Sequence, residues 1–192
     1  KALRYGTAGD LALGTFLALY WILDEHHARW GEFGVEQVNR LHEQGRMFQE
    51  RDHILTGFYT YQREFNAPGS TMPIELALDR RYGGVAAFII DLADGRTAAD
   101  ADAFFTSIEC PGDVALLCMP FPIDPRSPAD VPRSAGNHVN FIAFTVEDPA
   151  EVWAERFAGL GQRVTDAGLG TVRLASPFRS SVFGTDTYID EL

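Results

Sequence analysis

Two spacings of hydrophobic residues, one typical of strands and one of helices, divide the first part of the chain into predicted elements. Residues 14–23 are apolar on both faces, as in a strand that is covered on each side. Asp24 then offers an N-cap, and the apolar spacing through Gln44 predicts a helix that stops near Gly45. A second helix is predicted to open at Thr97 and to run to about residue 108, and further strands are predicted over 54–65, 74–78, 84–92 and 114–122.

A stretch rich in proline, serine and aspartate at 123–137 interrupts this pattern and predicts a linker. After it, a strand is predicted over 138–146, followed by Asp148-Pro149 as the start of a helix over 150–160. The last two predicted strands are 171–177 and 185–192. We therefore expect an α+β protein with one unit over 1–122, the linker at 123–137 and a smaller β-α-β-β unit over 138–192.

Composition and charge narrow the classes of partner. Of the 192 residues, 46% are hydrophobic and 12% aromatic, enough for a sizeable globular core. The net charge of −11 argues against nucleic acid or an anionic membrane surface as a partner. The apolar run at 11–23 is too short to cross a bilayer and is followed by Asp24-Glu25, so we expect a cytoplasmic protein. Cys110 and Cys118 are expected to be buried thiols rather than a disulfide framework.

The densest group of titratable residues is Asp24-Glu25-His26-His27. An imidazole beside carboxylates can act as a general acid or base, which makes His26 and His27 candidate catalytic residues. Adjacent helical residues point about 100° apart, so only one of the two histidines could face a given pocket. The alternative is an exposed, charged helix start in which the acidic residues complement the helix dipole.

The predicted strand 54–65 carries the second group of candidates. Tyr59 and Tyr61 share one face of it and could hold a substrate oxygen, and His53 precedes it as a further catalytic candidate. Phe58 lies on the other face and is a candidate for substrate binding. Aromatic residues in such a stripe can equally form a core or an interface. Arg81 could bind a substrate carboxylate, or it could belong to a surface turn.

The β-α-β-β-α-β order of 14–122, with Tyr20-Trp21 at a strand end and Asp24-Glu25-His26-His27 opening a helix, resembles the EthD-like members of the dimeric α+β barrel superfamily. The resemblance implies a ferredoxin-like subunit that pairs as a homodimer. It also implies a small apolar or aromatic substrate, with Trp21 near it, and lyase, isomerase, cyclase or monooxygenase chemistry. Many members act without a tightly held cofactor, and a minority hold haem.

The second unit resembles a module of the vicinal oxygen chelate family, through the strand 137–146, Asp148-Pro149 and the end Tyr188-Ile-Asp-Glu-Leu192. That resemblance implies a divalent metal with His138 and Glu191 as ligands. The family usually pairs two such modules, whereas the N-terminal half does not repeat this spacing.

Three functions are therefore open. The first is an enzyme that uses general acid/base chemistry on a small apolar or aromatic molecule without a cofactor. The alternatives are a metal-dependent enzyme of the oxygen chelate type and a module that binds a small molecule without changing it.

Overall fold

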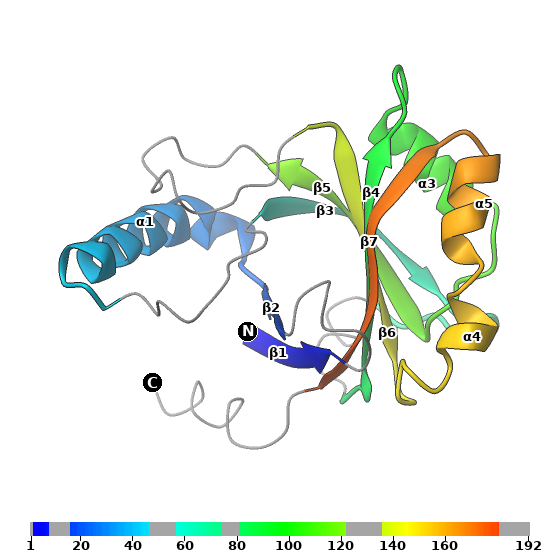
Figure 1. Ribbon diagram of the computed structural model, residues 1–192, viewed down its shortest axis with the longest axis horizontal. Coiled ribbons are helices and arrows are strands. Elements are labelled where there is room, and N and C mark those ends of the chain that lie inside the picture. The colour runs from blue at the N-terminus through cyan, green and yellow to red at the C-terminus, as the bar shows by residue number, and fades with distance from the viewer. Residues whose placement is uncertain (1, 8–15, 47–56, 74–80, 122–135, 181–192) are drawn as a thin grey trace.

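The computed structural model describes residues 2–7, 16–46, 57–73, 81–121 and 136–180 (Figure 1). The strands are β1 (Ala2–Thr7), β2 (Phe16–Tyr20), β3 (Phe58–Asn66), β4 (Gly84–Leu92), β5 (Val114–Phe121), β6 (His138–Thr145) and β7 (Gly170–Ser180). The helices are the 3-10 turn η2 (Asp24–His26), α1 (His27–Glu43), α3 (Ala98–Thr106), α4 (Trp153–Arg156) and α5 (Leu160–Asp166). In the ranges given above, no helix is both long and apolar enough to cross a membrane.

The described strands form one seven-stranded sheet in the order β2-β1-β7-β4-β6-β5-β3, and neighbouring strands are antiparallel. An antiparallel sheet with helices packed on it confirms the α+β class. Strand β4 is apolar on both faces, and it lies at the centre of the sheet as such a pattern predicts.

The sheet is shared between the two segments that precede and follow the predicted linker. Strand β4 lies between β6 and β7, with Asp91 opposite both His138 and Thr171. Among the described strands of 14–122, only β3 and β5 pair with each other, because β2 pairs with β1 and β4 pairs with strands from beyond the linker. Most of the linker itself, 122–135, lies outside the described residues.

Helices α3, α4 and α5 cover one face of the sheet, on the right in Figure 1. The core between them is aromatic: the rings of Phe105 and Phe141 stack 3.9 Å apart, and Phe88 stacks on Trp153 at 5.6 Å. Thr97 and Asp100 form the capping box at the start of α3, where the Asp100 carboxylate accepts hydrogen bonds from the Thr97 backbone N–H and hydroxyl, each at 2.8 Å.

The opposite face carries a second apolar cluster, and the other edge of the sheet folds over part of it. Trp21, directly after β2, packs on Phe144 of β6 with ring centroids 6.3 Å apart, and Tyr82 packs on the same ring at 5.0 Å. Leu17 and Leu19 of β2 join this cluster. Since β2 and β6 are not neighbours in the sheet, these contacts require the sheet to curl around this face.

Two local predictions were wrong in part. Asp24 was expected to be the N-cap of the first helix, but it lies within η2, whose N-cap is Leu23. Instead of one helix over 150–160, the chain forms a turn, the four-residue α4 and then α5, which begins at Leu160. This break lets Phe157, Leu160 and Val164 all be buried against the sheet. Strand β1 was not predicted, and the predicted strands 74–78 and 185–192 lie outside the described residues.

Candidate functional site

An irregularity in β3 determines which side chains face which side of the sheet. Tyr61 lies opposite Cys118, but the register shifts so that Arg63 lies opposite Leu117. As in a β-bulge, the shift reverses the alternation of side chains. Tyr59 therefore packs in the apolar cluster of the face away from α3–α5, whereas Phe65 packs against the helix-side core.

Tyr59 meets His138, the first residue of β6, on the face away from the helices. The hydroxyl oxygen of Tyr59 lies 3.3 Å from Nε2 of His138, and the rings meet edge to face with centroids 5.8 Å apart. His138 is buried, with 1% of its surface exposed, whereas Tyr59 is only half-buried. Tyr59 is thus the member of the pair that retains solvent contact.

The second nitrogen of His138 fixes the direction of this hydrogen bond. Nδ1 lies 3.2 Å from the backbone carbonyl oxygen of Gly136. A carbonyl oxygen only accepts hydrogen bonds, so the Nδ1 atom carries the proton. When the ring is neutral, Nε2 is therefore the acceptor of a hydrogen bond from the Tyr59 hydroxyl. Gly136 has a φ of 89°, a conformation that residues with a side chain rarely adopt, and this conformation places the carbonyl. His138 is therefore oriented as a base toward the Tyr59 hydroxyl.

An ion pair lies beside the Tyr59–His138 pair. Asp91, opposite His138 in the register of β4 and β6, accepts a hydrogen bond at 2.9 Å from Nε of Arg173 and a second contact from its Nη2. The hydrogen bond to Asp91 is the main cause of the pKa of Arg173, which is raised above its ordinary value. Desolvation lowers this pKa, whereas the electrostatic effects of Asp91 and Tyr59 raise it. Asp91 and Arg173 carry opposite charges, so together they add no net charge to the site.

Asn140 completes the site from the same face of β6. It lies opposite Cys118 on one side and Ile89 on the other, and both of these are buried. Its side-chain oxygen Oδ1 is buried and has no hydrogen-bond partner among the described residues. An unpaired buried acceptor is unfavourable in a folded protein, and such atoms are found where a ligand or water completes the bonding.

The predicted catalytic histidines lie elsewhere. His26 is exposed at the end of η2, and His27 is half-buried at the start of α1. Neither η2 nor α1 contains a buried residue. The third predicted histidine, His53, lies outside the described residues.

The other predicted residues are spread over the sheet. Tyr61 shares a face with Tyr59 but is 41% exposed, and Phe58 points to the opposite face. Trp21 packs on Phe144, toward the other end of β6, and Arg81 is exposed.

Sequence reasoning did not select Asp91, Asn140 or Arg173. Asp91 stood out as the one charged residue within the apolar run 84–92, and a charge in such a strand is usually paired. The sequence could not identify Arg173 as the partner of Asp91, because β4 and β7 are far apart in the chain.

The alternative metal site cannot be assembled from the described residues. They contain no group of three or more His, Cys, Asp or Glu side chains placed to hold a metal ion, and Glu191 lies outside them. Both ring nitrogens of His138 already have hydrogen-bond partners in Tyr59 and Gly136. The metal site with His138 and Glu191 therefore stays a prediction, as does haem.

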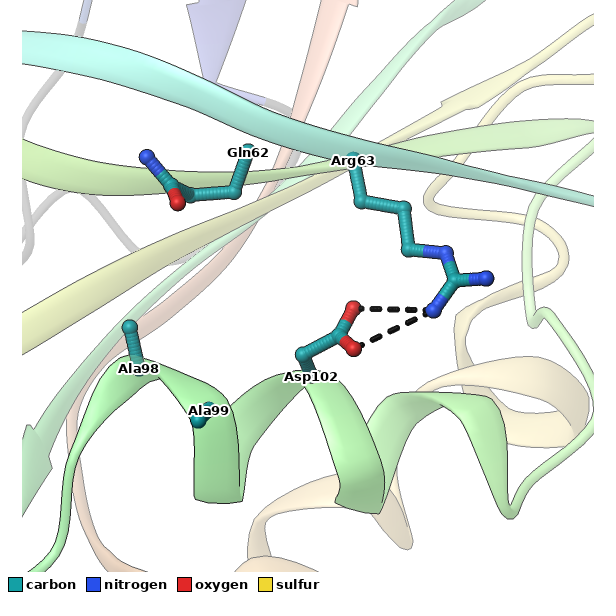
Figure 2. A pocket seen from close by; sticks show the side chains of 5 residues that line it. All are labelled: Gln62, Arg63, Ala98, Ala99 and Asp102. Atoms are coloured by element: carbon teal, nitrogen blue, oxygen red, sulfur yellow. Dashed lines mark hydrogen bonds and ion pairs between the residues drawn. The ribbon is translucent and has the colours of Figure 1, made fainter.

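A separate hollow of about 450 Å³ lies between β3 and α3 (Figure 2). Arg63 and Asp102 face each other across it, with Nη1 of Arg63 3.1 and 3.2 Å from the two carboxylate oxygens. Gln62, Ala98 and Ala99 line the rest. The hollow and the Tyr59–His138 pair thus lie on opposite faces of β3. The pair of the half-buried Tyr59 and the buried His138 is the better functional candidate, because the charges in the hollow neutralise each other in solvent.

Comparisons with models of protein families, with curated proteins and with solved structures find no match to this chain. The functional argument therefore rests on the geometry above.

Proposed function

We propose that this protein is an enzyme that moves a proton to or from a small, uncharged molecule, with Tyr59 and His138 as its acid/base pair. The observation that carries the proposal is the 3.3 Å contact between the Tyr59 hydroxyl and Nε2 of a buried histidine whose Nδ1 proton is held by a carbonyl. A half-buried hydroxyl backed by a buried base is an arrangement suited to general acid/base catalysis.

The proton moves in two linked transfers. The substrate gives up a proton from a C–H or O–H group to the Tyr59 oxygen, while the proton of Tyr59 passes to Nε2 of His138. The resulting imidazolium keeps its Nδ1–H bond to Gly136, and Asp91 stands opposite it on β4. Reversal of the same two transfers returns the proton to another atom of the substrate. No electron, metal or second substrate is needed for this balance.

The class of reaction is the one expected from the sequence: isomerisation, elimination or cyclisation of a carbon acid or a phenol. The residues differ, since we assign to His138 the role expected of His26 or His27. Tyr59 keeps its predicted role at the substrate. The neutral site favours an uncharged substrate, because a charged group would lose hydration on a half-buried face without a counter-ion of its own.

We also propose that the ferredoxin-like unit spans 84–180, rather than 14–122. The element order β4-α3-β5-β6-α4-α5-β7, with β7-β4-β6-β5 as the strand order, is that of two interleaved β-α-β units. The homodimer remains part of the proposal. Large side chains exposed near β2 and along α1, such as Leu23 and Phe33, are where we expect its contact. Light scattering on the purified chain, with Phe33→Glu as the disrupting variant, measures this directly.

Exchange of substrate hydrogen in deuterated water tests the catalytic proposal without knowledge of the product. The purified chain is incubated with a panel of uncharged ketones, 1,3-dicarbonyl compounds and phenols, and deuterium uptake is followed by mass spectrometry. We expect exchange with at least one compound, and we expect Tyr59→Phe and His138→Gln to slow it by roughly 100-fold or more. Tyr61→Phe is the matched control on the same face of β3 and should retain the exchange. Absence of exchange across the panel, or full exchange in Tyr59→Phe, would refute the proposal.

A further inference from the structure

The unpaired oxygen of Asn140 points to the chemistry of the ligand. Asn140 and His138 are two residues apart on β6, so their side chains leave the same face roughly 7 Å from each other. The cross-strand neighbours of Asn140, Cys118 and Ile89, are 5% and 7% exposed and offer no side-chain donor of the strength of an N–H or O–H group. The acceptor therefore has two apolar, almost fully buried cross-strand neighbours, and it lies two residues along β6 from His138.

The surroundings add two restrictions on the partner of this acceptor. Asp91 and Arg173 form an ion pair with each other, so the residues named at this site offer no net charge to hold an ion. Cys118 and Ile89 are almost fully buried, so the half-buried Tyr59 is the member of this group that a bound molecule can contact, and its aromatic ring favours a flat or cyclic carbon skeleton.

We infer that Asn140 forms a specificity site for an uncharged cyclic molecule that donates an O–H or N–H hydrogen bond to Oδ1, a phenol or a cyclic amide being the simplest examples. The inference rests on the proposed function for the location of the site, and it adds the class of substrate. A molecule that lacks the donor would leave Oδ1 unpaired, which is the condition under which polar sites discriminate most strongly.

Matched pairs of ligands test the inference directly. Phenol is compared with anisole, and 2-pyridone with N-methyl-2-pyridone, since each second compound keeps the ring and loses the donor. Binding to the full chain is measured by NMR, with the backbone amides of His138 and Asn140 as reporters of the site. We expect the donor compounds to bind about tenfold more tightly than their methylated partners, a ratio typical of one buried hydrogen bond.

The variant Asn140→Leu removes the acceptor at nearly constant volume. We expect the ratio to fall to about one, and the Tm to equal or exceed that of the unmodified protein, because an unpaired buried polar atom has been removed. Gln62→Leu is the matched control, since it removes an amide from β3 in the hollow on the other face and should leave the ratio unchanged. If Asn140→Leu does not fold, the ligand pairs on the unmodified chain decide alone.

Equal binding within each pair, tighter binding of the methylated compounds, or an unchanged ratio in Asn140→Leu would each overturn the inference. The deuterium exchange described above is a separate readout. Donor preference without exchange supports the inference and refutes the proposed catalysis, whereas exchange without donor preference refutes the inference and leaves the catalysis standing.

Discussion

The hydroxyl of Tyr59 lies 3.3 Å from Nε2 of His138, a residue 79 positions further along the chain. The two come together because β5 lies between their strands and pairs with both β3 and β6. The irregularity in β3 then determines that Tyr59 faces the same side as His138, while Arg63 turns toward α3. The catalytic proposal depends on this relationship, and the predictions below test the structure that supports it.

The ion pair beside Tyr59 and His138 should contribute modestly to stability. Its two side chains are 38% and 37% exposed for Asp91 and Arg173, so solvent screens the attraction. In a double-mutant cycle with Asp91→Asn and Arg173→Gln, we expect a coupling of about 0.5–1 kcal/mol in the free energy of unfolding. Urea denaturation of the four proteins measures it, and additive effects of the two single changes would contradict the pairing.

The stacked rings of Phe105 and Phe141 should be a main source of stability. Both are buried, and their centroids are 3.9 Å apart. We expect Phe105→Ala to lower the free energy of unfolding by about 3–5 kcal/mol, because the cavity it leaves lies between α3 and the sheet. Phe104→Ala is the control one position away, on a half-buried side chain, and should have a clearly smaller effect. Equal losses in the two variants would argue against this packing.

Both cysteines should resist modification in the folded protein. Burial raises the pKa of Cys110 to about 11 and that of Cys118 to about 12. Since the thiolate is the reactive form, we expect almost no reaction with a disulfide reagent at pH 8 and two equivalents in denaturant. The time course of thiol release gives this result directly, and fast labelling of Cys118 in the native state would show that the sheet face around it is open.

The start of α3 should lose stability in acid. Hydrogen bonds from Thr97 lower the pKa of Asp100 below its ordinary value of 3.8. A group with a lowered pKa in the folded state stabilises the fold fully above its unfolded pKa, and this contribution disappears as the pH falls through the folded value. We therefore expect Asp100→Asn to lower the Tm at pH 6 but to have little effect on it near pH 2. A constant difference in Tm across this range would contradict the assignment.

Sequence alone determined the elements whose signals are local. The apolar run 84–92 matches β4 at both ends, the apolar spacing that follows Asp24 predicts α1, and Thr97 marks the start of α3. Each of these depends on side-chain period and capping within a few residues, which a chain displays before it folds. Where burial of Phe157 and Leu160 competed with helix continuity, the local prediction over 150–160 was wrong.

Only the tertiary structure decided the order of the strands and therefore the site. Periodicity shows that β4 is buried on both faces, but not that β6 and β7 are its neighbours. The same limit applies to Tyr59 and Asn140, since a pattern of period two assigns residues to a face without saying what that face meets. From the sequence, His138 could be identified only as a candidate metal ligand. The role as a base that we propose for it rests on a carbonyl at Gly136 and a hydroxyl on β3, which are contacts between groups that only the folded sheet brings together.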